Sequence, residues 1–137
     1  MSTRREFCAG CCLLACGAVL GAQPAPDGEA PLKRTQETRA GMKPGSVRDY
    51  RKLGRFFLVA DAAGIYALTS VCTHRGCNVN AAGAEGFHCP CHDSEYDPQG
   101  RVTEGPARLP LRHLLVREAG GLLEVDVSVS VDPTVRI

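Results

Sequence analysis

Cysteine and histidine occur together in two short segments, and such a pair of segments indicates a metal centre. The first has the form Cys-x-His and the second the form Cys-x-x-His, and 14 residues separate His74 from Cys89. We call residues 72–77 the first box and residues 89–94 the second box. Together they offer two thiolates and two imidazoles: Cys72, His74, Cys89 and His92. Each box has one further cysteine, Cys77 or Cys91, at a matching offset that places the two well for bridging the boxes.

The ligand set leaves two kinds of metal centre open. Two sulfur and two nitrogen ligands in a tetrahedral arrangement suit either zinc or iron–sulfur chemistry. A structural zinc site is the simpler interpretation, but zinc sites usually pair Cys with Cys and His with His. Here each box mixes one Cys with one His, and zinc leaves Cys77 and Cys91 without a role. The spacing therefore favours iron–sulfur chemistry.

The charges are unevenly distributed along the chain. Residues 33–55 carry eight Lys or Arg against two acidic residues, whereas residues 56–137 carry six basic against ten acidic residues. The half that holds the boxes is therefore acidic, and the chain has no Trp. Both observations argue against a nucleic-acid partner. We interpret the basic stretch as a solvated surface, with anionic lipid or an acidic partner as alternatives.

The first 22 residues have the pattern of an export signal. Arg4 and Arg5 precede a charge-free hydrophobic stretch, residues 7–22, and this resembles the twin-arginine signal. That route carries folded proteins, so a cofactor inserted inside the cell can travel with its domain. We therefore expect an extracytoplasmic, periplasmic location, where a disulfide persists.

The fate of the hydrophobic stretch is left open by the sequence. Its sixteen residues fall short of the roughly 20 that span a bilayer comfortably. Cleavage near Ala22 would release a soluble protein. Retention as an anchor, or lipidation of Cys16 after cleavage, would hold the protein at the membrane.

The rest of the chain divides into a linker and one domain. Residues 23–46 hold four prolines and no apolar period, so we expect a flexible linker there. In residues 47–137, short β-prone runs broken by turn signals predict an all-β fold, a small antiparallel β sandwich or barrel. The runs are residues 55–59, 65–69, 111–117 and 122–129, the last two joined at Gly120-Gly121. The boxes fall in loops between strands, and structural or surface roles are expected for His88 and His113.

Around the boxes the sequence resembles the Rieske [2Fe–2S] family. The resemblance covers residues 45–130, and its motifs are both boxes, Ser94-x-Tyr96-Asp97, Gly105-Pro-Ala107 and Leu109-Pro-Leu111. It implies a Rieske-type fold with a cluster-binding subdomain of two loops and one [2Fe–2S] cluster per chain. By this resemblance, one iron is held by Cys72 and Cys89 and the other by His74 and His92. It also implies a disulfide between Cys77 and Cys91 and a covering loop at residues 105–111.

The resemblance further implies a high redox potential. Two neutral imidazoles in place of thiolates remove negative charge, and Rieske centres span about −150 to +300 mV. In high-potential members, residues at the positions of Ser94 and Tyr96 donate hydrogen bonds to sulfur, which stabilise the reduced state. Two residues depart from the family: Arg75 stands where quinol-oxidising members carry Leu, and Asp93 replaces Gly.

We therefore expect an electron-transfer protein without a separate catalytic site. The leading hypothesis is the iron–sulfur subunit of a quinol:cytochrome c reductase-type complex, with quinol and cytochrome b or c as candidate partners. One alternative is the small Rieske subunit of a periplasmic molybdenum oxidase of the arsenite oxidase type. Another is a stand-alone redox lipoprotein.

Overall fold

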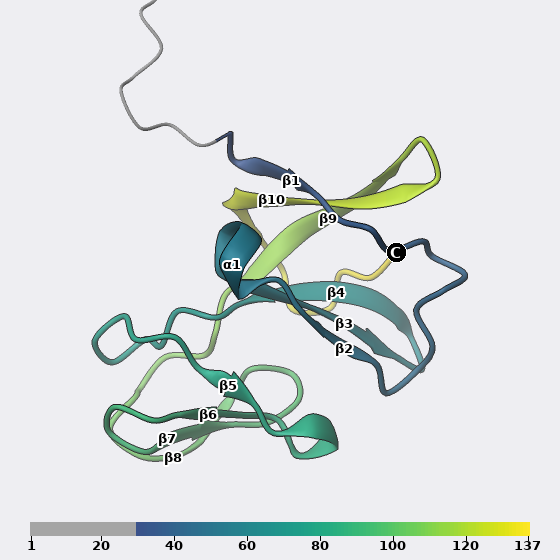
Figure 1. Cartoon of the computed structure of the whole chain (residues 1–137). Coiled ribbons are helices and arrows are strands. Elements are labelled where there is room, and N and C mark those ends of the chain that lie inside the picture. Colours follow the sequence, from purple (N-terminus) through teal and green to yellow (C-terminus); the bar gives the residue numbers. More distant parts are fainter. Residues whose placement is uncertain (1–29) are drawn as a thin grey trace, which may run out of the picture.

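The computed structural model describes residues 30–137, and within them the strands form two antiparallel sheets (Figure 1). The larger sheet has the strand order β1-β10-β9-β4-β3-β2. Its strands are β1 Leu32–Arg34, β2 Val47–Asp49, β3 Phe56–Asp61, β4 Gly64–Thr69, β9 His113–Ala119 and β10 Leu122–Val131. The smaller sheet contains β5 Asn80–Ala81, β6 Phe87–Cys89, β7 Ser94–Tyr96 and β8 Val102–Glu104. A four-residue helix, α1 Arg51–Gly54, precedes β3, and a 3₁₀ turn, Gly83–Glu85, precedes β6.

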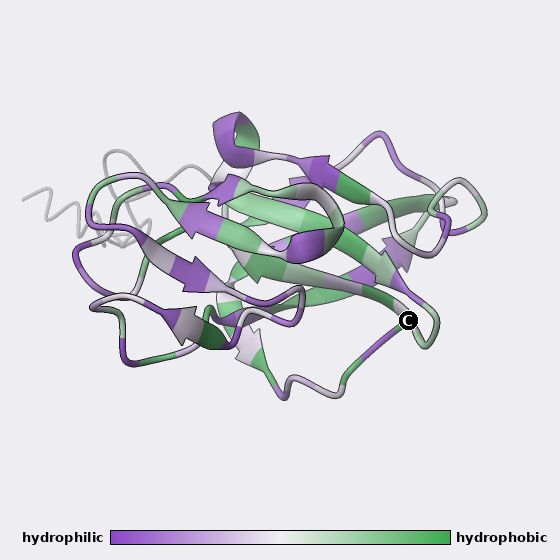
Figure 2. Cartoon of the chain, turned by 90° about the horizontal axis from the view of Figure 1, so that it is seen from below, coloured by the Kyte–Doolittle hydropathy of each residue, from purple (hydrophilic) through white to green (hydrophobic). Residues whose placement is uncertain are grey.

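The strands β3 and β4 are buried on both faces, which explains why their sequences are almost continuously apolar. Side chains of a strand point alternately to opposite faces. From β3, Phe56 and Leu58 join the core enclosed by the curved larger sheet, whereas Phe57 and Val59 join a second core on the opposite face. Figure 2 shows long apolar stretches on the inner strands.

The second core lies between the two sheets, and it contains cysteines of both boxes. It is built from residues of both layers: Phe57, Val59, Tyr66, Leu68, Cys72, Val79, Phe87, Cys89, Tyr96, Ala107 and Leu111. Figure 1 shows the smaller sheet below strands β2, β3 and β4 of the larger one. The larger sheet therefore serves as the base on which the smaller sheet and both boxes are built.

The structure confirms the all-β expectation and corrects the expected linker. The expected runs occur as β3, β4, β9 and β10, and Gly120 and Gly121 both adopt positive φ in the turn between the last two. Part of the segment assigned to a flexible linker is instead β1, which pairs in register with β10. Thr35, just after β1, is buried and donates to the Leu123 carbonyl at 2.8 Å.

Residues 1–29 lie outside the described residues, and with them the export signal, Cys16 and the first part of the linker. Across residues 30–137, no helix has the length and apolar character needed to cross a bilayer.

Candidate metal centre

The first box lies in the loop that follows β4 and is closed by its own backbone. The Cys72 amide donates to the Cys77 carbonyl at 2.7 Å, and the Gly76 amide donates to the Cys72 carbonyl at 2.9 Å. An isolated bridge between Val71 and Asn78 pairs the two ends of the loop. These bonds fix the relative position of the two cysteines without a long strand.

The second box forms the turn of the β6–β7 hairpin. Cys89 stands opposite Ser94 in the register, and the Asp93 amide donates to the Cys89 carbonyl at 3.0 Å. Asp93 adopts a φ of 58°, a left-handed conformation that Asp accepts better than most residues. Asp93, at the position where the family carries Gly, therefore preserves the turn while adding a carboxylate that meets His88 Nε2 at 3.2 Å.

A third segment, residues 105–111, packs against the second box, and we call it the covering loop. Gly105 has a φ of 94°, and a Cβ at this position would lie 2.5 Å from Ser94 Cα. Only glycine permits this approach. The Ala107 amide then donates to Ser94 Oγ at 3.1 Å. This contact joins the covering loop to the second box.

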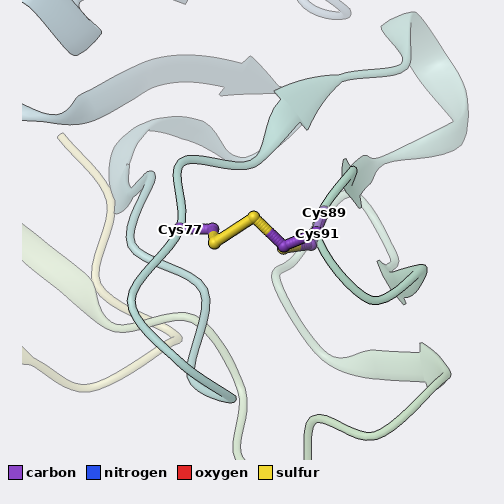
Figure 3. Close-up of side chains that lie close together, drawn as sticks. All are labelled: Cys77, Cys89 and Cys91. Carbon is purple, nitrogen blue, oxygen red and sulfur yellow. A yellow bond between two sulfur atoms is a disulfide. The ribbon is translucent and has the colours of Figure 1, made fainter.

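A disulfide joins the two boxes, as the resemblance implied. Cys77 and Cys91 are bonded, with 6.6 Å between their Cα atoms (Figure 3). The Cys89 sulfur lies within 4.8 Å of both sulfurs of this bond. This group of three is not a ligand set, because metals bind thiolates and two of the sulfurs are already bonded to each other.

The remaining predicted ligands come together as two like pairs. Cys72 and Cys89 are free and almost fully buried, and they lie close enough for each thiol to shift the pKa of the other. The imidazoles of His74 and His92 lie edge to face, with 4.8 Å between their ring centroids. Nδ1 of His74 is buried and has no hydrogen-bond partner among the described residues. A buried nitrogen of this kind calls for a ligand.

The spacing of these pairs fits two metal ions better than one. At zinc bond lengths of about 2.0–2.3 Å, four tetrahedral ligand atoms would lie roughly 3–4 Å apart. Within residues 30–137, the group of three cysteines around the disulfide is the sole set of ligand atoms that gathers within 4.8 Å. The thiol pair and the imidazole pair therefore do not converge on one point, as a mononuclear zinc site would require.

The environment of the thiols distinguishes Cys72 from Cys89. Burial opposes ionisation of Cys72, but hydrogen bonds from the Tyr96 hydroxyl and the His74 amide hold the pKa of its thiol below the ordinary value. Burial raises the pKa of the Cys89 thiol, and the neighbouring Cys72 adds to that rise. The site is therefore prepared to stabilise negative charge first at the Cys72 sulfur.

Strand β7 supplies two buried hydroxyl groups near the boxes, from Ser94 and Tyr96. The Tyr96 hydroxyl lies 3.3 Å from Cys72 Sγ, and Tyr96 is 1% exposed. The Ser94 hydroxyl is fully buried and accepts from the Ala107 amide, which leaves its own proton available for a further acceptor. Both residues were predicted from the sequence; the structure places the Tyr96 hydroxyl beside Cys72 and bonds the Ser94 hydroxyl to the covering loop.

Two arginines and one threonine at the site were missed by the sequence analysis. Arg55 donates to the Gly76 carbonyl at 2.7 Å and to the Asn78 side chain at 2.9 Å, so it supports the first box from the base. Arg51 likewise donates to the Val79 carbonyl at 3.1 Å. Thr73 lies inside the first box, but the pattern gave no reason to single it out. Arg75 is exposed.

Comparison with known families identifies the domain. The sequence model of the Rieske [2Fe-2S] domain matches residues 33–115. The chain belongs to the Rieske [2Fe–2S] family. The matched region begins inside the segment expected to be a linker, in agreement with the position of β1 in the sheet.

Iron-sulfur subunits of cytochrome b6-f complexes are among its relatives. The cytochrome b6-f complex iron-sulfur subunit of Synechococcus sp. (strain WH7803) is 52% identical over 52 residues, which are 37% of this chain and 29% of the relative. The chloroplastic subunit of Arabidopsis thaliana is 51% identical over 63 residues, 44% of this chain and 28% of the relative. The aligned regions thus span less than a third of either relative.

Solved structures of two redox complexes share the fold. A chain of a hyperthermophilic respiratory Complex III is 29% identical, with a TM-score of 0.53 over 66% of this chain and 72% of that chain. A chain of the carbazole 1,9a-dioxygenase complex with its ferredoxin reaches a TM-score of 0.50 at 18% identity, over 70% of this chain and 28% of that one. The second likeness concerns the fold alone. The first, with the sequence relatives, supports an electron-transfer role.

Membership of the family makes a Rieske-type [2Fe–2S] cluster the cofactor of this chain. The residues present fit such a group. Two buried free thiols form one pair, two imidazoles form another, and one imidazole nitrogen is buried without a partner among the described residues. A group with two irons and bridging sulfurs matches this division, because Rieske centres carry two cysteines on one iron and two histidines on the other.

Proposed function

We propose that this protein is an exported one-electron carrier in which Cys72 and Cys89 hold one iron and His74 and His92 hold the other. The division of the donors into a thiol pair and an imidazole pair is the observation that carries this proposal. Once bound, the cluster supplies a one-electron redox centre. The protein determines its potential, its access to water and its contact with partners.

The residues around the site favour a high potential. The Tyr96 hydroxyl lies 3.3 Å from Cys72 Sγ and can donate to it when that sulfur is a thiolate. The buried Ser94 hydroxyl accepts from the Ala107 amide and keeps its own proton for a further acceptor. Hydrogen bonds to sulfur stabilise the more negative reduced state and raise the potential. The disulfide and the covering loop hold the two boxes together. The imidazole of His92 is exposed, so this ligand is the point at which a partner can approach.

A quinol:cytochrome c reductase-type complex is the leading setting for this carrier. The likeness to cytochrome b6-f iron-sulfur subunits and to Complex III supports this assignment. In such a setting the donor is quinol and the acceptor is a c-type cytochrome. The test is to measure reduction of cytochrome c by quinol in membranes that contain the protein. We expect this reduction to be sensitive to inhibitors of quinol oxidation.

The surface beside His74 favours a second setting, the small Rieske subunit of a periplasmic molybdenum oxidase. A cleft of about 530 Å³ beside His74 is lined by Thr73, Gly105, Pro106 and the exposed Arg108. Exposed Arg75 directly follows His74. Two guanidinium groups there suit a polar partner surface better than an apolar quinol pocket. Molybdenum in the purified complex, with no b-type haem, would favour this setting over the first.

Cluster binding is tested by electron paramagnetic resonance and a redox titration of the full-length protein. We expect a Rieske-type signal with a positive midpoint potential at neutral pH. His92→Ala should abolish the signal, whereas the matched change His88→Ala, at a half-exposed histidine outside the proposed ligand set, should retain it. A negative midpoint would contradict the high-potential assignment, and an unchanged signal in His92→Ala would contradict the ligand assignment.

Export is supported by the paired arginines and by the disulfide, which persists in oxidising compartments. Mass spectrometry of the mature N-terminus separates the three fates of the hydrophobic stretch. A start near Gln23 indicates simple cleavage, a lipidated Cys16 indicates a lipoprotein, and an intact start indicates an anchor. Accumulation of the wild type in the cytoplasm would contradict export.

A further inference from the structure

The Thr73 hydroxyl connects the first box to the covering loop and to Tyr96. It donates to the Leu109 carbonyl at 2.7 Å and lies 3.1 Å from the Tyr96 hydroxyl. The Thr73 amide also donates to the Tyr96 oxygen, at 3.2 Å. The same Tyr96 hydroxyl is 3.3 Å from Cys72 Sγ. One threonine thus contacts the group that hydrogen-bonds the sulfur.

Counting protons assigns the direction of each bond. A hydroxyl carries one proton, and a carbonyl oxygen only accepts. The Thr73 proton is therefore used by Leu109, and Thr73 Oγ1 can face Tyr96 only as an acceptor. Tyr96 likewise has one proton, but it has two acceptors within reach, Thr73 Oγ1 and Cys72 Sγ. These two acceptors compete for it.

We propose that Thr73 is a positioning residue that lowers the potential of the cluster by drawing the Tyr96 proton away from the Cys72 sulfur. This inference rests on the proposed role of Cys72 as an iron ligand. A hydrogen bond to the sulfur matters most in the reduced state, which carries one more negative charge. Sharing the proton with Thr73 weakens that bond, so the oxidised state is favoured relative to a site without the threonine hydroxyl. No proton leaves Tyr96 in either state.

Because the competition depends on Leu109, the covering loop takes part in it. If Thr73 lost the Leu109 carbonyl, its hydroxyl could rotate and donate toward the Tyr96 oxygen. Tyr96 would then give its proton wholly to Cys72. The exposed Leu109, 65% accessible, is therefore connected to the sulfur through two hydroxyl groups.

The test is the midpoint potential of the full-length protein, followed by electron paramagnetic resonance. Thr73→Val removes the competing acceptor with little change of shape, and we expect a shift to higher potential. Tyr96→Phe should shift the potential lower and by a larger amount. Thr73→Ser, which keeps the hydroxyl, should stay near the wild type. Thr103→Val, at an exposed threonine on β8, is the matched control and should leave the potential unchanged.

A double-mutant comparison separates the proton effect from a general loosening of the loop. In the Tyr96→Phe background, Thr73→Val should produce no further shift, because the shared proton is already gone. An equal shift in both backgrounds, or a lower potential in Thr73→Val alone, would overturn the inference. Thr73→Ala provides the same comparison if Thr73→Val does not retain the cluster. A wild type without any Rieske signal would overturn the proposed function as well, so the two failures are distinguishable.

Discussion

The inner strands of the larger sheet are six to ten residues long and enclose a core of their own, whereas the strands of the smaller sheet have two or three residues. Within the described part of the chain, the smaller sheet has no core of its own. It packs on the outer face of β3 and β4, opposite the core that the larger sheet encloses. Strands this short do not form a stable sheet alone. The base is therefore stabilised by apolar packing, and the cluster-binding part depends on the base and on cross-links.

Those cross-links are of three kinds. The Cys77–Cys91 disulfide joins the boxes, Thr73 and Ser94 each hold the covering loop, and Arg55 connects the first box to the base. Each acts between segments that have little regular secondary structure. The comparison shows that rigidity at the site comes from specific bonds, while the fold comes from the larger sheet.

A substitution in the core of the base should destabilise both sheets. Leu58→Ala removes a fully buried side chain from the core of the larger sheet and is expected to lower the free energy of unfolding by about 2–5 kcal/mol. Chemical denaturation monitored by circular dichroism measures this loss. Leu109→Ala, at an exposed leucine of the covering loop, is the control and should change it by less than about 0.5 kcal/mol. Equal effects would contradict the role given to the base.

Loss of the disulfide should affect mainly the smaller sheet. The bond closes a loop with a sequence separation of 14, and such a loop contributes about 3 kcal/mol. In the double variant Cys77→Ser/Cys91→Ser, amide hydrogen exchange should accelerate in both boxes. Exchange in β9 and β10 should remain slow. Uniform acceleration in both sheets would show that the two regions unfold as one unit.

A change at Gly105 should disturb the covering loop and the site but leave the larger sheet intact. Gly105→Ala places a Cβ 2.5 Å from Ser94 Cα at a positive φ, so the covering loop has to move. A strained backbone of this kind costs about 1–3 kcal/mol. We expect a smaller loss of global stability than in Leu58→Ala, together with a lower midpoint potential as the loop withdraws. Gly120→Ala, in the open β9–β10 turn, carries backbone strain without a clash and should leave the potential unchanged.

The smallest expected effect is a pH dependence at the contact between the two regions. His113 on β9 stacks on Tyr66 and donates from Nε2 to the Gln99 carbonyl, in the loop that joins β7 to β8. Burial holds the pKa of His113 below its ordinary value, so below about pH 6.5 the unfolded chain binds a proton that the native protein does not. Native stability should therefore fall on acidification.

That fall can be assigned to His113 by substitution. Denaturation at several pH values between about 7 and 5, the range in which an ordinary histidine titrates, should show a shallower loss of stability in His113→Gln than in the wild type. An identical slope in the two proteins would show that other groups cause the loss.

The sequence predicted the parts of the molecule that depend on short spacing. The four proposed ligands, the disulfide and the two hydroxyls lie in compact motifs, and β3 and β4 are continuous apolar runs. In contrast, β1 was taken for a linker because three residues, Leu32–Arg34, give no local period, and their partners in β10 lie about 90 residues later. Arg55 and Thr73 act through contacts that only the fold creates, so no pattern around them indicated their roles.

The covering loop also has a consequence for how firmly the protein retains its cofactor. Thr73 of the first box holds it at Leu109 and Ser94 of the second box holds it at Ala107, while the disulfide joins the two boxes. The disulfide and the covering loop thus tie together the two segments that would hold the cofactor. We therefore expect these connections to slow loss of the cofactor from the folded protein, and opening any one of them to speed it.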